Sequence, residues 1–86
     1  MARPRRLSHQ ALDVLRALAE EPEQWRYGYE LSAQLRLPAG SLYPILTRLA
    51  DRGLLEAAWE ATPPPGRPPR HMYRITVAGE ETAEKT

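Results

Sequence analysis

Arginine and hydroxyl side chains concentrate in three parts of this sequence. Residues 41–52 hold Ser41, Tyr43, Pro44, Thr47 and Arg48, and a proline-rich segment at residues 62–70 holds Arg67 and Arg70. Three further arginines, Arg3, Arg5 and Arg6, form a basic N-terminal arm at residues 1–6. Because hydroxyl and guanidinium groups hydrogen-bond base edges and phosphates, these side chains are candidates for binding double-stranded DNA.

The sequence lacks a comparable set of residues for catalysis or metal binding. Cysteine is absent, and His9 and His71 lie far apart in the chain. Ser8, His9 and Asp13 could be combined as a nucleophilic set. However, Ser8 suits the N-cap of a helix, and His9 and Asp13 form an ordinary i,i+4 surface pair. We therefore expect no enzyme activity, no cofactor and no metal site.

The chain of 86 residues has the size of a single domain, residues 1–86, with little room for an enclosed active site. Its net charge is only +1, but arginines and acidic residues cluster in different segments, so the domain can present one basic face. No apolar run approaches the roughly 20 residues of a membrane span. We expect a protein of the cytoplasm, associated with the nucleoid and not with a membrane.

Apolar residues recur at helical spacing in the first half of the chain, where three helices are expected. The Ser8 hydroxyl can cap the first helix, and Pro22 ends it. The connection to the second helix carries Trp25 and Tyr27. The first helix is expected to run from residue 9 to just before Pro22, the second from about 28 to 36, and the third from about 39 or 40 to 52.

The third of these helices has the clearest apolar stripe. Its members follow one another at i, i+3, i+4 and i+7, and they are Leu42, Ile45, Leu46 and Leu49. Pro44 lacks the N–H of a helix interior, so the regular part of this helix should begin at about Ser41. Gly53 suits the position just after its end. The pattern predicts one buried face and one outward face.

The period of the apolar residues changes from helical to alternating after residue 53. Residues 55–60 and 72–75 alternate apolar and polar side chains and predict two strands. Between them, residues 62–69 contain five prolines and a glycine, which excludes helix and strand and predicts a stiff loop. Thr76 can cap a short final helix over residues 77–84.

Three helices, a two-stranded β-hairpin and a short C-terminal helix define an α+β, mainly α, winged helix-turn-helix domain. In this architecture the third helix packs through its apolar stripe and offers its other face to the major groove of DNA. Residues 62–70 form the wing, where Arg67 is placed to reach phosphates or the minor groove and Arg70 lies at the base. These features predict sequence-specific binding of double-stranded DNA.

Three alternatives apply to these surfaces. A winged helix domain can bind another protein without contacting DNA, and salt distinguishes the two, because DNA binding releases counterions and weakens steeply. A proline-rich ligand for an aromatic groove would need a free segment, whereas this one is clamped between two strands. Trp25, Tyr27 and Trp59 are either core residues, the interpretation we prefer, or part of a pocket for a small aromatic effector.

Several short motifs resemble the PadR family of transcriptional regulators. They are Tyr27-Gly-Tyr-Glu-Leu31, Gly40-Ser-Leu-Tyr-Pro-Ile-Leu-Thr-Arg-Leu49, Arg52-Gly-Leu-Leu55, Gly66-Arg-Pro-Pro-Arg70 and Tyr73-Arg-Ile-Thr76 with Gly79. The resemblance implies a DNA-binding winged helix domain that is generally dimeric and a repressor, and that often responds to small aromatic or drug-like molecules. Its recognition helix would be Ser41–Arg52, with Ser41, Tyr43 and Pro44 on the matching motif, and its wing Pro63–Arg70.

The C-terminus departs from the pattern of that family. Its members generally continue beyond the second strand of the wing into a helical region that builds the dimer and often the effector site. Here the sequence ends ten residues after Thr76, which fits either a minimal member or a truncated C-terminal region. A homodimer is still expected, because one small module contacts little DNA.

Overall fold

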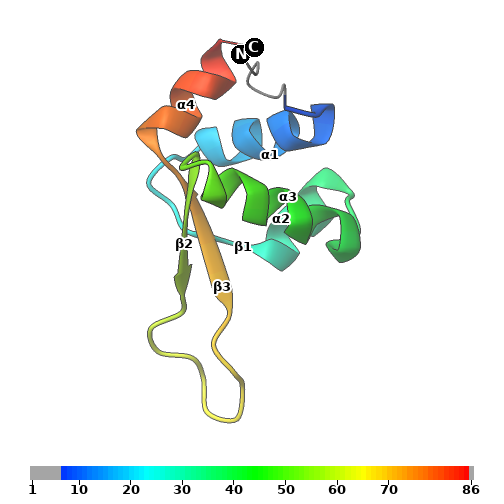
Figure 1. Ribbon diagram of the computed structural model, residues 1–86. Coiled ribbons are helices and arrows are strands. Elements are labelled where there is room, and N and C mark those ends of the chain that lie inside the picture. Colours follow the sequence, from blue (N-terminus) through cyan, green and yellow to red (C-terminus); the bar gives the residue numbers. More distant parts are fainter. Residues whose placement is uncertain (1–6, 86) are drawn as a thin grey trace.

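The computed structural model describes residues 7–85, which form four helices and a three-stranded antiparallel sheet (Figure 1). In chain order these are α1 (His9–Ala19), β1 (Arg26–Tyr27), α2 (Gly28–Leu35), α3 (Ala39–Asp51), β2 (Leu55–Trp59), β3 (His71–Ile75) and α4 (Val77–Glu84). The predicted arm with Arg3, Arg5 and Arg6 lies outside the described residues. None of the helices in residues 7–85 has the length and apolar character to cross a membrane. The order of elements confirms the predicted winged helix-turn-helix class.

The core lies between α1, α3 and the sheet. Three leucines of the predicted α3 stripe, Leu42, Leu46 and Leu49, are at most 1% exposed, and Ile45 packs at the edge of the same cluster. Fully burying a leucine side chain contributes about 1.5–3 kcal/mol, so this cluster determines how α3 is rotated about its axis. The opposite face of α3 must therefore point away from the core.

The predicted helix ends are confirmed by the local geometry. At the start of α1 the Ala11 N–H donates to Ser8 Oγ over 3.1 Å, and at the start of α4 the Gly79 N–H donates to Thr76 Oγ1 over 3.0 Å. Gly53 follows α3 with a φ of 75°, the left-handed conformation that ends many helices. These three ends define where the chain turns from one element to the next.

The start of α3 agrees with the predicted boundary at about residue 39 or 40, but its regular part begins earlier than the expected Ser41. The helix begins at Ala39, two residues before Ser41, with Pro38 in an extended conformation as its N-cap. Pro44 therefore lies in the second turn, where it removes the N–H that would bond to the Gly40 carbonyl. Because both Pro44 and Gly40 are exposed, water can satisfy that carbonyl, and the helix accommodates the proline on its solvent side.

The sheet also has one strand more than the predicted two-stranded hairpin, and the strand order is β1–β3–β2. β1 is two residues long and pairs with β3, with Arg26 opposite Tyr73 and Tyr27 opposite Met72. Two residues are too few for an alternating pattern, which is why the sequence does not reveal this strand. Through β1, the start of α2 is tied to the base of the hairpin.

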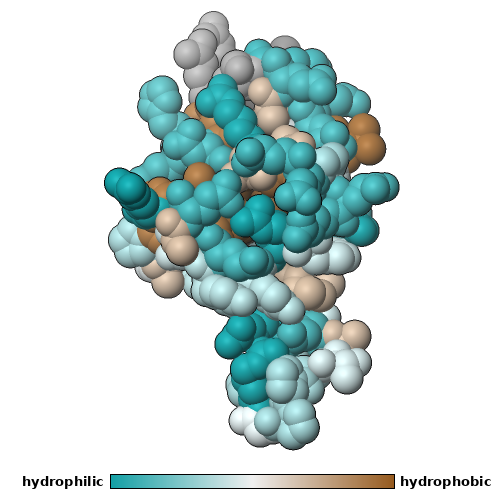
Figure 2. Space-filling view, turned by 180° about the vertical axis from the view of Figure 1, so that it is seen from behind, coloured by the Kyte–Doolittle hydropathy of each residue, from teal (hydrophilic) through white to brown (hydrophobic). Residues whose placement is uncertain are grey.

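The hairpin of β2 and β3 projects from the body and is closed by the proline-rich loop (Figures 1 and 2). At its tip the Arg67 N–H donates to the Pro64 carbonyl over 3.2 Å, and Gly66 has a φ of 81°. This fits a type II turn, which favours proline at its first central position, here Pro65, and needs glycine at the second. The loop forms the predicted wing, residues 62–70.

A substitution at Gly79 tests how closely α4 packs against the sheet. A methyl group at this position would lie 2.7 Å from Cγ1 of Ile75 and closer still to the Leu54 carbonyl. Because that backbone cannot move away easily, we expect Gly79→Ala to lower the free energy of unfolding by roughly 1–3 kcal/mol. Urea unfolding followed by circular dichroism measures the change.

Gly40→Ala is the control for this prediction. Its methyl group would meet no atom within 4 Å among the described residues outside its own helix. It should raise the free energy of unfolding by up to about 1 kcal/mol, because alanine has the higher helix propensity. Equal effects of the two substitutions would contradict the packing assigned to Gly79.

Candidate nucleic-acid interface

The outward face of α3 carries most of the predicted recognition side chains. Ser41, Pro44, Thr47 and Arg48 are all exposed and point away from the buried leucines. Within residues 7–85, no ion pair engages the guanidinium of Arg48. Asp51 is exposed near the end of the same helix. This face therefore offers hydroxyls and one cation, with a carboxylate at the C-terminal end of the helix.

Tyr43 lies at the border between α3 and α2. Its side chain is 42% exposed, and its ring covers Gly28, the first residue of α2. A Cβ atom at Gly28 would lie 2.5 Å from Tyr43 Oη, so the two helices approach closely at this point. Tyr43 thus connects the outward face of α3 to the surface beside it.

An open groove of about 330 Å³ forms that neighbouring surface. We call it the α2–wing groove, and it is lined by Tyr27, Gly28, Tyr29, Tyr43, Arg70 and His71. The rings of Tyr27 and Tyr29 stack 5.4 Å apart, and the Arg70 guanidinium lies 4.8 Å from the Tyr29 ring centroid, a cation–π contact. Among the ion pairs of the described residues none involves Arg70, so its charge is available to an anion.

Arg67, in contrast, is held by a carboxylate of its own chain. Its Nη2 atom lies 2.8 Å from Glu60 Oε1, and Tyr27 Oη donates a hydrogen bond of 2.7 Å to Glu60 Oε2. We call Tyr27, Glu60 and Arg67 the Glu60 latch. Through Glu60 the latch ties the wing to Tyr27 of β1, and the carboxylate neutralises the charge of Arg67. Arg70 is therefore the arginine that presents a free cation at the base of the wing.

The latch influences the protonation of its own groups. The hydrogen bond from Tyr27, together with Arg67, holds the pKa of the Glu60 carboxyl below its ordinary value, although partial burial opposes this. The same hydrogen bond raises the pKa of the Tyr27 phenol. At neutral pH the latch therefore consists of an ionised carboxylate between a neutral phenol and a guanidinium.

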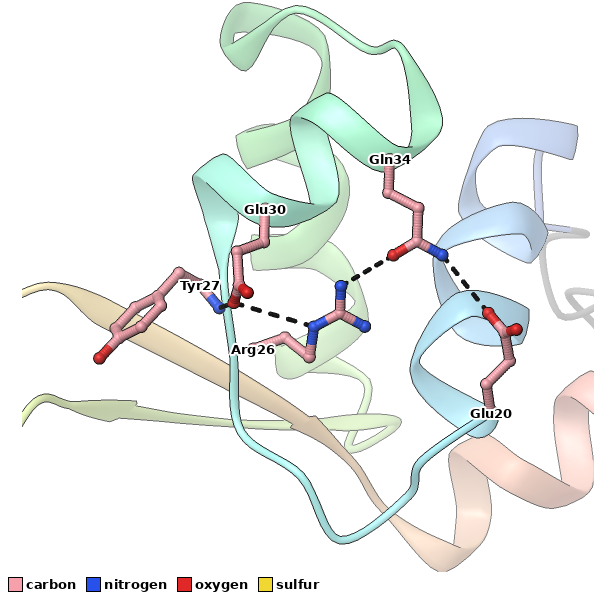
Figure 3. A network of polar contacts seen from close by, with 5 residues as sticks. All are labelled: Glu20, Arg26, Tyr27, Glu30 and Gln34. Carbon is pink, nitrogen blue, oxygen red and sulfur yellow. Dashed lines mark hydrogen bonds and ion pairs between the residues drawn. The ribbon is translucent and has the colours of Figure 1, made fainter.

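A chain of polar contacts positions the start of α2 (Figure 3). Glu30 accepts a hydrogen bond of 2.9 Å from the Tyr27 N–H and lies 3.8 Å from Nε of Arg26. Arg26 donates to Gln34 over 2.8 Å, and Gln34 donates to Glu20, at the end of α1, over 3.3 Å. The chain links α1, β1 and α2, and it holds Tyr27 in the wall of the groove.

The three aromatic residues considered as core or effector pocket lie in three different surroundings. Trp25 is half-buried beneath the Arg74 guanidinium, at 4.4 Å, and Tyr27 lines the α2–wing groove. Trp59 is 63% exposed, so the preferred core assignment is wrong for this residue. Alternation indicates which face of a strand a side chain occupies, but not where the strand leaves the body of the protein.

Over residues 14–85 the sequence matches the Transcriptional regulator PadR-like family. The chain belongs to this family. Membership confirms the resemblance found in the sequence motifs and implies that the PadR-like domain binds DNA. A comparison with curated proteins found no match.

Solved structures of regulators share this PadR-like fold. A PadR family transcriptional regulator from Eggerthella lenta DSM 2243 is 31% identical, with a TM-score of 0.71, over 88% of this chain and 69% of that one. A chain from Methanosarcina mazei Go1, described as a possible transcriptional regulator, is 20% identical, with a TM-score of 0.75, over 92% and 66%. A mutant of MepR from S. aureus is 14% identical, with a TM-score of 0.78, over 92% and 54%. The chain thus spans between 54% and 69% of these proteins.

Sequence reasoning missed Glu60, Tyr29 and His71 as neighbours of this interface. Glu60 counted only as part of the polar face of a strand, because its partner Tyr27 lies 33 residues earlier. The hairpin register contained a signal, since it sets Glu60 opposite Arg70, where the Glu60 N–H donates to the Arg70 carbonyl. Strand pairing therefore points to the region of the latch, although not to its members.

Lowering the pH should release the Glu60 latch of this PadR-like domain. Because the pKa of Glu60 is lowered in the folded state, the contribution of the latch is complete above the ordinary carboxyl value of 4.5. It is lost as the pH falls through the lowered value. We expect the amides of Thr62, Gly66 and Arg67, which carry an N–H in the wing loop, to gain sub-nanosecond motion in that acidic range, which ¹⁵N relaxation measures.

Glu60→Gln should produce the same motion at neutral pH, because the neutral amide cannot form the ion pair. Glu56→Gln is the matched control, since Glu56 pairs with Arg74 over 2.7 Å nearer the body on the same hairpin. It should leave the wing unchanged. Identical wing dynamics in Glu60→Gln and the wild type at neutral pH would contradict the latch.

Proposed function

We propose that this chain binds double-stranded DNA in a sequence-specific manner and represses transcription as a homodimer, in the cytoplasm and associated with the nucleoid. One observation supports the proposal most strongly. The exposed face of α3 and the α2–wing groove adjoin, because Tyr43 belongs to both. A recognition helix and a basic wing base on one surface match the two kinds of contact that a DNA duplex offers.

Arg48 and Arg70 suit different parts of the duplex. Arg48 lies on α3, where a guanidinium can donate two hydrogen bonds to O6 and N7 of a guanine in the major groove. Arg70 lies against the Tyr29 ring at the base of the wing, where it suits a backbone phosphate. Because Glu60 neutralises Arg67, we expect Arg67 to contribute less than Arg70. The other α3 contacts are assigned to Ser41, Tyr43, Pro44 and Thr47.

The DNA-binding proposal is tested by selecting duplexes from a random library and measuring the affinity of variants by fluorescence anisotropy. Arg48→Ala should weaken binding to the selected duplex by about tenfold or more and relax the base preference at one position. Arg70→Ala should weaken binding to all duplexes alike and reduce the slope of log affinity against log salt by about one.

Arg74→Ala is the matched control, because it removes the same charge from the neighbouring strand. Arg74 pairs with Glu56 over 2.7 Å and covers Trp25, and it does not line the groove. It should leave the affinity and the salt slope unchanged. Equal losses for Arg70→Ala and Arg74→Ala would contradict the proposed interface, and a protein that enriches no duplex would reject DNA binding altogether.

A homodimer would supply the second half of the binding site. A single small module covers roughly 600–1,000 Å² on DNA, whereas specific regulators generally use more. A two-fold axis would place two copies of α3 in successive major grooves of a pseudo-palindromic site, about 34 Å apart. We expect two protomers on each selected duplex in analytical ultracentrifugation, and a single protomer on a saturated duplex would contradict the dimer.

A further inference from the structure

Trp59 is a large aromatic side chain exposed on the wing. It is 63% exposed, and its ring stacks on His71 with centroids 3.8 Å apart. His71 meets the Tyr73 ring edge-on at 5.6 Å, and His71 Nδ1 lies 3.3 Å from Tyr73 Oη. Tyr73 is itself buried in the core. A row of three rings therefore holds the exposed indole in a fixed orientation.

This row lies on the inner face of the sheet. The register of β2 and β3 places the following side chains on one face: Leu55, Ala57, Trp59, His71, Tyr73 and Ile75. Leu55, Tyr73 and Ile75 are buried together with the leucines of α3. Trp59 and His71 continue that face beyond the edge of the core, on the side of the sheet that α3 covers.

The face of the ring pair carries no negative charge that would repel an anionic partner. None of the six side chains on this face is a carboxylate. Glu60 follows Trp59 directly, but it points to the other face, where Tyr27 and Arg67 hold it. Arg70, which the hairpin sets opposite Glu60, also points to that other face, where it lies over the Tyr27 ring.

We propose that Trp59, braced by His71, packs against the deoxyribose wall of the minor groove beside the major groove that α3 enters. This inference rests on the proposed DNA binding and adds a contact outside the recognition surface described above. A ring that is already ordered gains contact area with little loss of rotamer freedom. Because wing side chains in the minor groove respond to its width, Trp59 contributes affinity and a preference for groove shape.

A protein surface suits the ring pair less well. A stable protein interface covers about 800 Å² on each partner. The wing is a narrow projection from the body (Figures 1 and 2). A narrow projection fits a groove better than it fits a flat surface.

Salt dependence separates this contact from a phosphate contact. Trp59→Ala should weaken binding to the selected duplex about tenfold at every salt concentration, because an apolar contact releases no counterions. Trp59→Phe keeps a ring and should recover most of the affinity. Since Trp59 is mostly exposed, both variants should keep the circular dichroism spectrum and melting temperature of the wild type.

Tryptophan fluorescence reports the contact directly, because the chain contains two tryptophans. Trp25→Phe leaves Trp59 as the emitter, and Trp59→Phe leaves Trp25. We expect the selected duplex to quench Trp59 and to shield it from acrylamide. Trp25, which lies under Arg74, should respond little and serves as the control.

Each outcome decides the proposal. Unchanged affinity of Trp59→Ala, or acrylamide quenching of Trp59 that the duplex does not reduce, overturns the contact while DNA binding stands. A smaller salt slope in Trp59→Ala also overturns it, because the ring would then act through a phosphate contact. A variant that binds DNA normally but no longer dimerises assigns the ring to a protein contact instead. A wild-type protein that binds no duplex overturns this contact and the proposed function together.

Discussion

Burial of the α3 stripe is the constraint on which the rest of this structure depends. Leu42, Leu46 and Leu49 cannot leave the core without exposing apolar surface that a domain of 86 residues needs for its stability. The outward face of the helix is determined by the same packing. Strand β2 leaves this core at Leu55, so the direction of the wing relative to α3 follows from it as well.

The two faces of the hairpin carry different chemistry. One face holds Glu60, which binds Tyr27 and Arg67 and fixes the tip, and the other exposes Trp59 on His71. Strand alternation makes this separation possible, because consecutive residues point to opposite sides. Glu60 and Trp59 are neighbours in the sequence, but Glu60 makes a contact within the protein whereas Trp59 is exposed to a partner. A substitution of one side chain therefore leaves the contacts of the other in place.

The fold could be predicted to the extent that it depends on short-range patterns. The α3 stripe, the two hydroxyl caps and the proline loop each act within a few residues, and so does the exposed face with Arg48. Longer-range features could not be predicted: β1 has no period, and the latch joins residues far apart in the chain. The different surroundings of Arg67 and Arg70 depend on Glu60, and the exposure of Trp59 depends on where β2 leaves the core.

The bent and tied wing has a kinetic consequence. In the unbound protein, Pro65 and Gly66 already form the turn at the tip of the wing, and Glu60 already binds Arg67. Docking of such a preformed segment requires no folding step, so encounter is governed by diffusion and orientation. Among related complexes of rigid partners, differences in affinity appear mainly in the dissociation rate. The lifetime of the complex, more than the speed of its formation, is then the quantity that distinguishes one binding site from another.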